Sequence, residues 1–294
     1  MASRLRVGAF KSAGTVLEVL PERFDRVLAS VGARLGARAG GASRRNLADN
    51  LRHVLASGVP VDDALVERFA ARALDNYAQY WAESAKLPAI SADTIVRRFR
   101  ISEGLHHLQE AKERGLGTVV ALPHVGSWEW GGAYLAQIGM PMTAVAEALE
   151  PPALFEWFRA KRESIGIHIE PLDEHAGTVL LQTLRDGGVV GLLCDRDIQG
   201  NGIEVEFFGE LVTMPAGPAT LALRTGATLV TAACYAGPRL DHHAVVGAPI
   251  EVAREGRLRE DVRRVTQLIA RDLEGLIQRA PEQWHVLERR FAQA

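Results

Sequence analysis

The feature of this sequence that most restricts its fold is a series of short apolar runs, each followed by a segment of helical periodicity. Residues 118–122 and 189–194 are almost wholly β-branched or aliphatic, which is typical of strands buried on both faces of a sheet. Helical segments are expected at 105–114, 128–138, 152–165, 176–185 and 259–279, and further strands at 142–146, 167–171, 228–235 and 243–252. This alternation predicts an α/β fold with a central mixed β-sheet flanked by helices.

The N-terminal third has a different pattern. From Val7 to about Leu87 the periodicity is helical, with breaks at Pro21, Gly40 and Pro60, and no strand is convincing. No linker or low-complexity tract divides the 294 residues. We therefore expect a single domain over 1–294, with a mainly helical N-terminal subdomain at 1–100 and an α/β catalytic part at 104–294.

Charge is distributed unevenly along the chain. The net charge is −2, but up to Pro60 there are 10 Lys and Arg against 4 Asp and Glu, a local excess of +6. These basic residues alternate with apolar ones, which indicates amphipathic helices on an anionic membrane surface. Alternatively, the apolar faces pack on the core and the arginines are simply solvated. The sequence pI of about 6.5 and the lack of a matching motif argue against nucleic acid.

Hydropathy and cysteine usage bear on the compartment. No stretch approaches the roughly 18 apolar residues of a transmembrane helix, and no signal peptide is recognised. The two cysteines, Cys194 and Cys234, lie in apolar strand-like runs, which fits a reducing compartment rather than a disulfide framework. Adjacent histidines at 106–107 and 242–243 have no ligand-spaced carboxylate or cysteine nearby, so no metal is expected.

The strongest candidate for chemistry follows the run 118–122. His124 and Glu129 lie in Leu-Pro-His-Val-Gly-Ser-Trp-Glu-Trp-Gly-Gly, at a strand-to-helix junction. If Ser127 caps a helix that begins at Trp128, Glu129 falls in its first turn and can contact a histidine held on the loop. A carboxylate on one imidazole nitrogen leaves the other free to act as a general base. The alternative is a histidine that satisfies a buried hydrogen bond beside a helix-start glutamate.

The string His-x4-Glu after an apolar strand resembles the lysophospholipid acyltransferase superfamily, in particular its lipid A biosynthesis (lauroyl/myristoyl) acyltransferase branch. Within it the sequence is more similar to actinobacterial phosphatidylinositol mannoside acyltransferases. The motifs that carry this likeness are Ala-Val-Ala-Glu147, Arg162 with Arg-Glu-Ser-Ile-Gly166, Cys194-Asp-Arg-Asp197, Phe207-Phe-Gly-Glu210, Met214-Pro-Ala-Gly-Pro218, Pro281-Glu-Gln-Trp-His285, Arg45-Asn-Leu47 and Tyr80-Trp81.

The resemblance implies a glycerolipid-acyltransferase-like fold and an acyl-CoA-dependent O-acyltransferase. The implied reaction moves a fatty acyl chain, palmitoyl by analogy, to a mannose hydroxyl, O6 by analogy, of a phosphatidylinositol mannoside. Acyl-CoA is a cosubstrate and no cofactor is bound permanently. The implied location is peripheral, on the cytoplasmic face of the inner membrane. Gram-negative lipid A is a less suitable acceptor because no N-terminal membrane span is recognised.

The resemblance also assigns roles to residues. His124 is the expected base and Glu129 its orienting carboxylate. Substrate or oxyanion contacts are expected from Glu147, Arg162, Asp195 and Arg196. Separately from the resemblance, Phe207 and Phe208 precede a Pro- and Gly-rich loop; we expect them to line an acyl groove, and the alternative is a core-packing turn. Asp195 stands where the mannoside enzymes commonly have Glu, although in that family this acidic residue approaches the catalytic histidine.

Other functions stay open from the sequence. A different glycolipid acceptor would need only a differently shaped cleft. An acyl-CoA thioesterase would use the same His124 on water, although no Gly-x-Ser-x-Gly elbow is present. A non-catalytic lipid-binding protein would explain the basic amphipathic N-terminus but not the clustered motifs.

Overall fold

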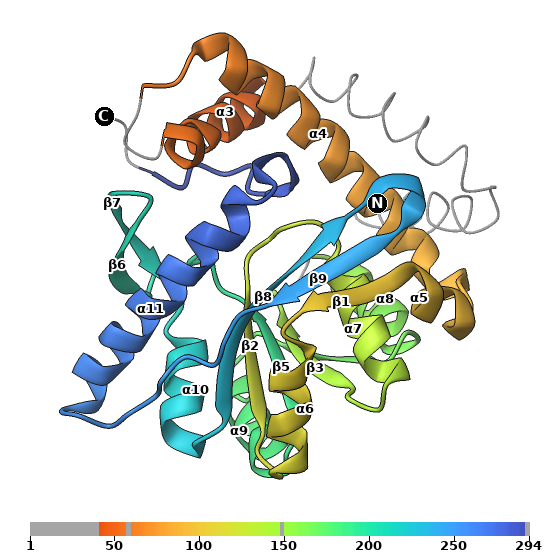
Figure 1. Ribbon diagram of the computed structural model, residues 1–294, viewed down its shortest axis with the longest axis vertical. Coiled ribbons are helices and arrows are strands. Elements are labelled where there is room, and N and C mark those ends of the chain that lie inside the picture. The colour runs from red at the N-terminus through yellow and green to blue at the C-terminus, as the bar shows by residue number, and fades with distance from the viewer. Residues whose placement is uncertain (1–40, 57–59, 148–149, 292–294) are drawn as a thin grey trace.

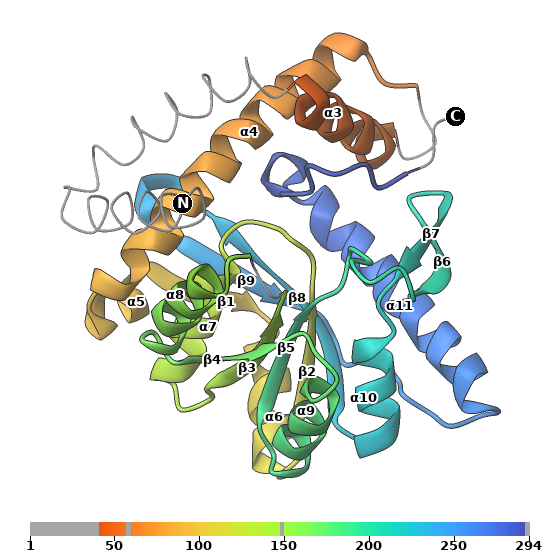
Figure 2. The same ribbon diagram turned by 180° about the vertical axis from the view of Figure 1, so that it is seen from behind.

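A computed structural model describes residues 41–56, 60–147 and 150–291, and it has the predicted α/β architecture (Figure 1). Seven strands form one sheet in the order β1-β9-β8-β2-β5-β3-β4. Helices cover both faces, as Figures 1 and 2 show from opposite sides. The basic residues before position 40 lie outside the described residues, so the predicted membrane-facing helices there stay a prediction.

The sheet is mixed, as predicted. Its five strands from β8 to β4 are parallel, whereas β9 runs antiparallel to β8 and pairs in parallel with β1. The central strand β2 aligns Thr118 with Val189 of β5 and with Thr228 of β8. The strands are β1 (Phe99–Glu103), β2 (Thr118–Leu122), β3 (Met142–Ala146), β4 (Ile167–Pro171), β5 (Val189–Leu193), β8 (Thr228–Ala236) and β9 (His242–Val246).

Strand β1 and a short hairpin were not predicted. β1 lies at the sheet edge and is mostly polar, so it lacks the apolar signal of a central strand. The hairpin joins β6 (Ile203–Phe207) to β7 (Glu210–Met214). Its turn residues Phe208 and Gly209 both have positive φ, 50° and 80°, as a type I′ turn requires. A bulky residue such as Phe is rare at positive φ, so the hairpin was not predicted from these residues.

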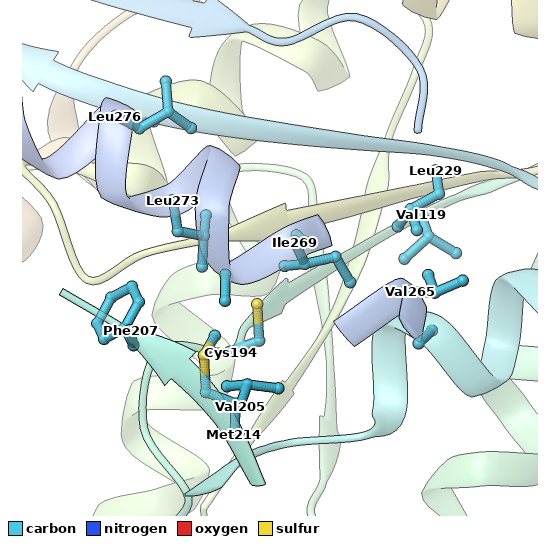
Figure 3. Packing of buried hydrophobic residues seen from close by; sticks show 14 of the residues in the cluster. Val119, Cys194, Val205, Phe207, Met214, Leu229, Val265, Ile269, Leu273 and Leu276 are labelled. Atoms are coloured by element: carbon cyan, nitrogen blue, oxygen red, sulfur yellow. The ribbon is translucent and has the colours of Figure 1, made fainter. Parts of the chain in front are cut away.

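Three helices pack on one face of the sheet. They are α9 (Ala176–Arg185), α10 (Gly217–Thr225) and α11 (Leu258–Gln278). Along α11 the buried Val265, Ile269 and Leu273 recur at helical spacing and face the sheet and the β6–β7 hairpin (Figure 3). This side forms the largest core cluster.

The opposite face is covered by α5 (Ala92–Arg98), α6 (Leu105–Glu113), α7 (Trp128–Gln137) and α8 (Pro152–Glu163). Alternate side chains of β2 pack on opposite faces of the sheet, since Val119 belongs to the first core cluster and Val120 to the second. Both faces of β2 are therefore buried, as its unbroken apolar run predicted.

The N-terminal part is helical in the described residues, with α3 (Gly41–Ala56) and α4 (Asp63–Lys86) packed on each other around Leu47, Leu51 and Val66. Single 3₁₀ turns occur at Leu87–Ala89, Pro238–Leu240 and Pro281–Gln283. Within the described ranges no helix has the length and apolar character needed to span a bilayer.

Candidate active site

His124 lies on a tightly fixed turn between β2 and α7. The turn needs glycine at position 126, because its φ is +57° and a Cβ there would lie 2.0 Å from the carbonyl oxygen of Cys234. Backbone bonds fix the same turn to the C-terminal segment: Gly126 N donates to Gln283 O at 2.9 Å, and His285 N donates to His124 O at 2.7 Å. The histidine backbone is thus held from two sides.

The carboxylate bonded to this histidine is Asp195. His124 Nδ1 lies 2.5 Å from Asp195 Oδ1, and the His124 backbone N–H donates to Oδ2 at 2.9 Å. Trp284 Nε1 also donates to Oδ2, at 2.7 Å. Asp195 follows β5, and Cys194 N donates to Leu122 O, so parallel pairing of β2 with β5 brings the two residues together. The two motifs therefore lie side by side at the carboxyl ends of these strands.

The environment keeps Asp195 charged. The side chain is fully buried, which by itself would raise the pKa of the carboxyl group. The charge and hydrogen bond of His124, together with the indole of Trp284 and the backbone N–H, lower the pKa of Asp195 to about 2. An ionised Asp195 on Nδ1 fixes the tautomer in which Nε2 is unprotonated and available as a base.

The predicted contact between Glu129 and His124 is wrong. Glu129 does lie in the first turn of α7, but its side chain is buried and turned toward α4 and α8. Its Oε1 accepts hydrogen bonds from Tyr80 Oη at 2.9 Å and from Arg162 Nη2 at 3.2 Å. Ser127 is the N-cap residue by position, but its hydroxyl accepts no hydrogen bond from the helix backbone and instead donates to Glu83. Glu129 therefore orients Arg162 instead of the imidazole.

Arg162 is a firmly positioned cation. It reaches from α8 over the rings of Trp128 and Phe158, at 5.0 and 5.8 Å from their centroids. Burial lowers the pKa of Arg162, but the charges of Glu129 and Tyr80 and the hydrogen bonds to them together outweigh this effect, and the net shift is upward. Burial and the Glu129 charge raise the pKa of Tyr80, which stays a neutral donor.

A cavity of about 690 Å³ opens in front of His124. Of the predicted residues, His124, Glu147, Arg162 and Arg196 line it, whereas Asp195 and Glu129 lie behind the lining side chains. Arg196 also forms a bidentate pair with Glu288 at 2.7 Å. Much of the wall is apolar, formed by Ile169, Leu172, Leu180, Leu181, Leu192 and Leu221. In the described part of the chain, no group of three or more His, Cys, Asp or Glu side chains could hold a metal ion.

The prediction that Phe207 and Phe208 line an acyl groove is wrong. Neither residue borders the cavity. Phe207 is fully buried and packs with Trp284 and Phe291, and Figure 3 places it beside Met214 and Leu273 in the core. Both rings pack against Trp284 and Phe291 of the C-terminal segment, and the apolar wall of the cavity comes from α9, α10 and the strands instead.

Sequence reasoning missed the functional position of Trp284 and His285. His285 lines the cavity, and its ring packs against Tyr80 and Tyr77 with centroids 5.3 and 5.6 Å apart. Burial, together with the neighbouring His124, lowers the pKa of His285 to about 3, so its imidazole is neutral. Both residues belong to the Trp-His ending that supports the resemblance, and this motif was the available signal.

Comparison with known proteins identifies the family of the chain. A phosphatidylinositol mannoside acyltransferase of Mycobacterium tuberculosis is 37% identical over 284 residues, which cover 95% of this chain and 86% of the relative. One from Mycolicibacterium smegmatis is 35% identical over 278 residues, covering 93% and 87%. Residues 8–293 match the family described as bacterial lipid A biosynthesis acyltransferase. The predicted resemblance is confirmed, and the chain belongs to the bacterial lipid A biosynthesis acyltransferase family.

Proposed function

We propose that this protein transfers a fatty acyl chain from acyl-CoA to a mannose hydroxyl of a phosphatidylinositol mannoside. The observation that carries the proposal is the His124–Asp195 pair at the wall of a large, partly apolar cavity. The acceptor class comes from the names of the mycobacterial relatives. Palmitoyl as the chain, O6 as the hydroxyl and acyl-CoA as the donor come from the family resemblance.

In this mechanism His124 Nε2 takes the proton of the mannose hydroxyl while the oxygen attacks the thioester carbonyl carbon. The tetrahedral oxyanion then collapses, the C–S bond breaks, and the imidazolium returns its proton to the departing sulfur. An ester and coenzyme A as the free thiol are the products. Asp195 stabilises the imidazolium that forms between the two steps, in place of the originally predicted Glu129.

Three further groups at the cavity suit the polar parts of the substrates. Arg162 presents a guanidinium to the cavity, and planar guanidinium groups bind phosphate and oxyanions through paired donors. His285 is neutral, so it can donate one N–H to a hydroxyl or oxyanion without placing a second positive charge beside His124. Glu147 lines the same cavity as an exposed acceptor for sugar hydroxyls.

We further propose that the protein acts peripherally on the cytoplasmic face of the membrane, where both substrates present their polar groups. The basic excess before Pro60 supports contact with anionic lipid. Trp81 adds an aromatic ring that is 38% exposed at the cavity rim, and tryptophan is favoured at membrane interfaces.

The test is turnover with palmitoyl-CoA in the presence and absence of phosphatidylinositol mannoside, with thiol release followed and the lipid product identified by mass spectrometry. Acceptor-dependent acyl-lipid should form, and His124→Ala should abolish it. His168→Ala is the matched control, because His168 is exposed on β4 and does not border the cavity. Thiol release without acceptor would instead indicate a thioesterase. If acyl-lipid formed only with a different glycolipid, that glycolipid would be the acceptor instead.

A further inference from the structure

The apolar wall of the cavity continues between α9 and α10. It is formed there by Leu180 and Leu181 of α9, Leu192 of β5 and Leu221 of α10, and we call this part the apolar arm. Along α10 the residues that border the cavity are Pro218 and, at helical spacing, Gly217, Thr220, Leu221 and Arg224. Their spacing of three and four residues places them in one stripe, roughly 10 Å long at 1.5 Å rise per residue.

Two glycines border this arm where other side chains would fill it. A Cβ added at Gly177 of α9 would meet no atom within 4 Å. One added at Gly217 would meet only Leu192 Cδ1, at 3.8 Å, which is ordinary contact. Both glycines are exposed and line the cavity. Both positions border the cavity, and a side chain at either would enter open space rather than meet a neighbouring atom at short range.

Packing does not account for Gly177. At Gly191, which also lines the cavity, a Cβ would lie 2.2 Å from Met142 Sδ, so close packing requires glycine there. Gly177 has neither such a neighbour nor a positive φ. Glycine at position 177 leaves open space at the cavity wall.

We propose that Gly177 is a specificity-determining residue that admits long acyl chains by keeping the apolar arm open. This inference rests on the proposed function, in that the occupant of the arm is the acyl chain of the donor. A saturated chain suits the site because the arm offers leucine side chains and no buried charge. Leu180 and Leu181 lie three and four residues beyond Gly177, so a side chain at 177 would share their face of α9.

The size of the effect follows from methylene burial. Each buried methylene contributes about 0.8 kcal/mol, which is about fourfold in affinity. A leucine at position 177 that displaces two or three methylenes should therefore weaken binding of the longest chains about 15-fold to 60-fold. Chains too short to reach the arm should bind as before. Gly177→Ala should have a small effect.

The direct test measures binding of unreactive alkyl-CoA thioethers with chains of about 10 to 18 carbons to the full-length protein by titration calorimetry. Wild-type affinity should rise with chain length, and Gly177→Leu should remove the rise for the longest chains. Gly275→Leu is the matched control, since Gly275 is an exposed glycine of α11 with no atom within 4 Å of its added Cβ and no place in the cavity wall. Leucine is favoured in helices, so neither variant should unfold.

Unchanged chain-length dependence in Gly177→Leu, or the same change in Gly275→Leu, would overturn the assignment of Gly177. Wild-type affinity that does not depend on chain length would also overturn it. These outcomes are distinct from a failure of the proposed function. If long alkyl chains bind and Gly177→Leu weakens them, but no acceptor-dependent product forms, the chain site stands and the proposed reaction does not.

Discussion

Replacing Asp195 with asparagine tests the geometry at His124 most directly. The Asp195 carboxylate accepts three hydrogen bonds: one from His124 Nδ1, one from the His124 backbone N–H, and one from Trp284 Nε1. The last two converge on Oδ2, so the amide oxygen of asparagine should take that position and keep both. The amide NH₂ then faces His124 Nδ1 and must donate to it. The imidazole proton is forced onto Nε2, the nitrogen that should act as the base.

We expect Asp195→Asn to lower kcat by about 10³-fold to 10⁴-fold, as in triads where the same change gives the wrong tautomer. This corresponds to roughly 4 to 5.5 kcal/mol in the barrier. Substrate binding should change little, because Asp195 does not border the cavity. The assay is steady-state thiol release, together with ¹⁵N NMR of labelled histidine, which reports the protonated ring nitrogen without turnover.

The matched variant is Asp195→Glu, which keeps the carboxylate. The added methylene enters a fully buried site, and such overpacking costs about 1–3 kcal/mol of stability, but the tautomer should be retained. Activity should therefore exceed that of Asp195→Asn. An asparagine variant within tenfold of wild type, with Nδ1 still protonated, would refute the proposed role of Asp195.

Three other changes test the rest of the site. Glu129→Ala should lower the free energy of unfolding by about 3–5 kcal/mol in urea denaturation, because Arg162 keeps a buried charge without its carboxylate; a near-neutral result would contradict the pairing. Phe207→Ala should cost a similar amount through a core cavity, yet leave chain-length preference unchanged in the alkyl-CoA titration. His285 has its folded pKa lowered to about 3, so below about pH 6.5 the unfolded chain binds a proton that the folded protein does not. The free energy of unfolding should fall as pH decreases through this window, by about 2–3 kcal/mol at pH 4.5, and should fall less in His285→Gln. If urea titrations gave the same dependence of this free energy on pH for wild type and His285→Gln, the result would count against the burial of a neutral ring.

The fold was predictable where burial leaves a strong pattern. Strands β2 and β5 are unbroken apolar runs, and α11 repeats its buried residues at helical spacing. Because parallel neighbours end at the same edge of a sheet, the approach of His124 and Asp195 also followed from the sequence. Strand β1 and the β6–β7 hairpin escaped prediction because their residues are polar at an edge or occupy an unusual turn.

The contacts within the site were harder to predict because they depend on helix rotation. The position of Glu129 in the first turn of α7 was correct, but which way its side chain points is set by the packing of α7. Trp130 of α7 is buried and stacks on His242, and Trp128 lies under Arg162. These contacts turn Glu129 toward Tyr80 and Arg162. Closeness in sequence favoured Glu129 as the carboxylate partner of His124. The hydrogen bonds of the folded chain show that Asp195 is that partner.

The C-terminal segment explains why the site is not complete with the sheet alone. Trp284 donates to Asp195 Oδ2, and Arg290 Nε donates to the Asp195 carbonyl oxygen at 2.7 Å. The same segment is held by Asn50 of α3, whose side chain donates to the carbonyl oxygens of Val286 and Glu288 and accepts from Arg290 N. Asn50 is fully buried, so these bonds have no competing water. The helical N-terminal part thus acts on Asp195 through residues 284–290, and a change in α3 that loosens this segment should alter the charge and position of the carboxylate beside His124.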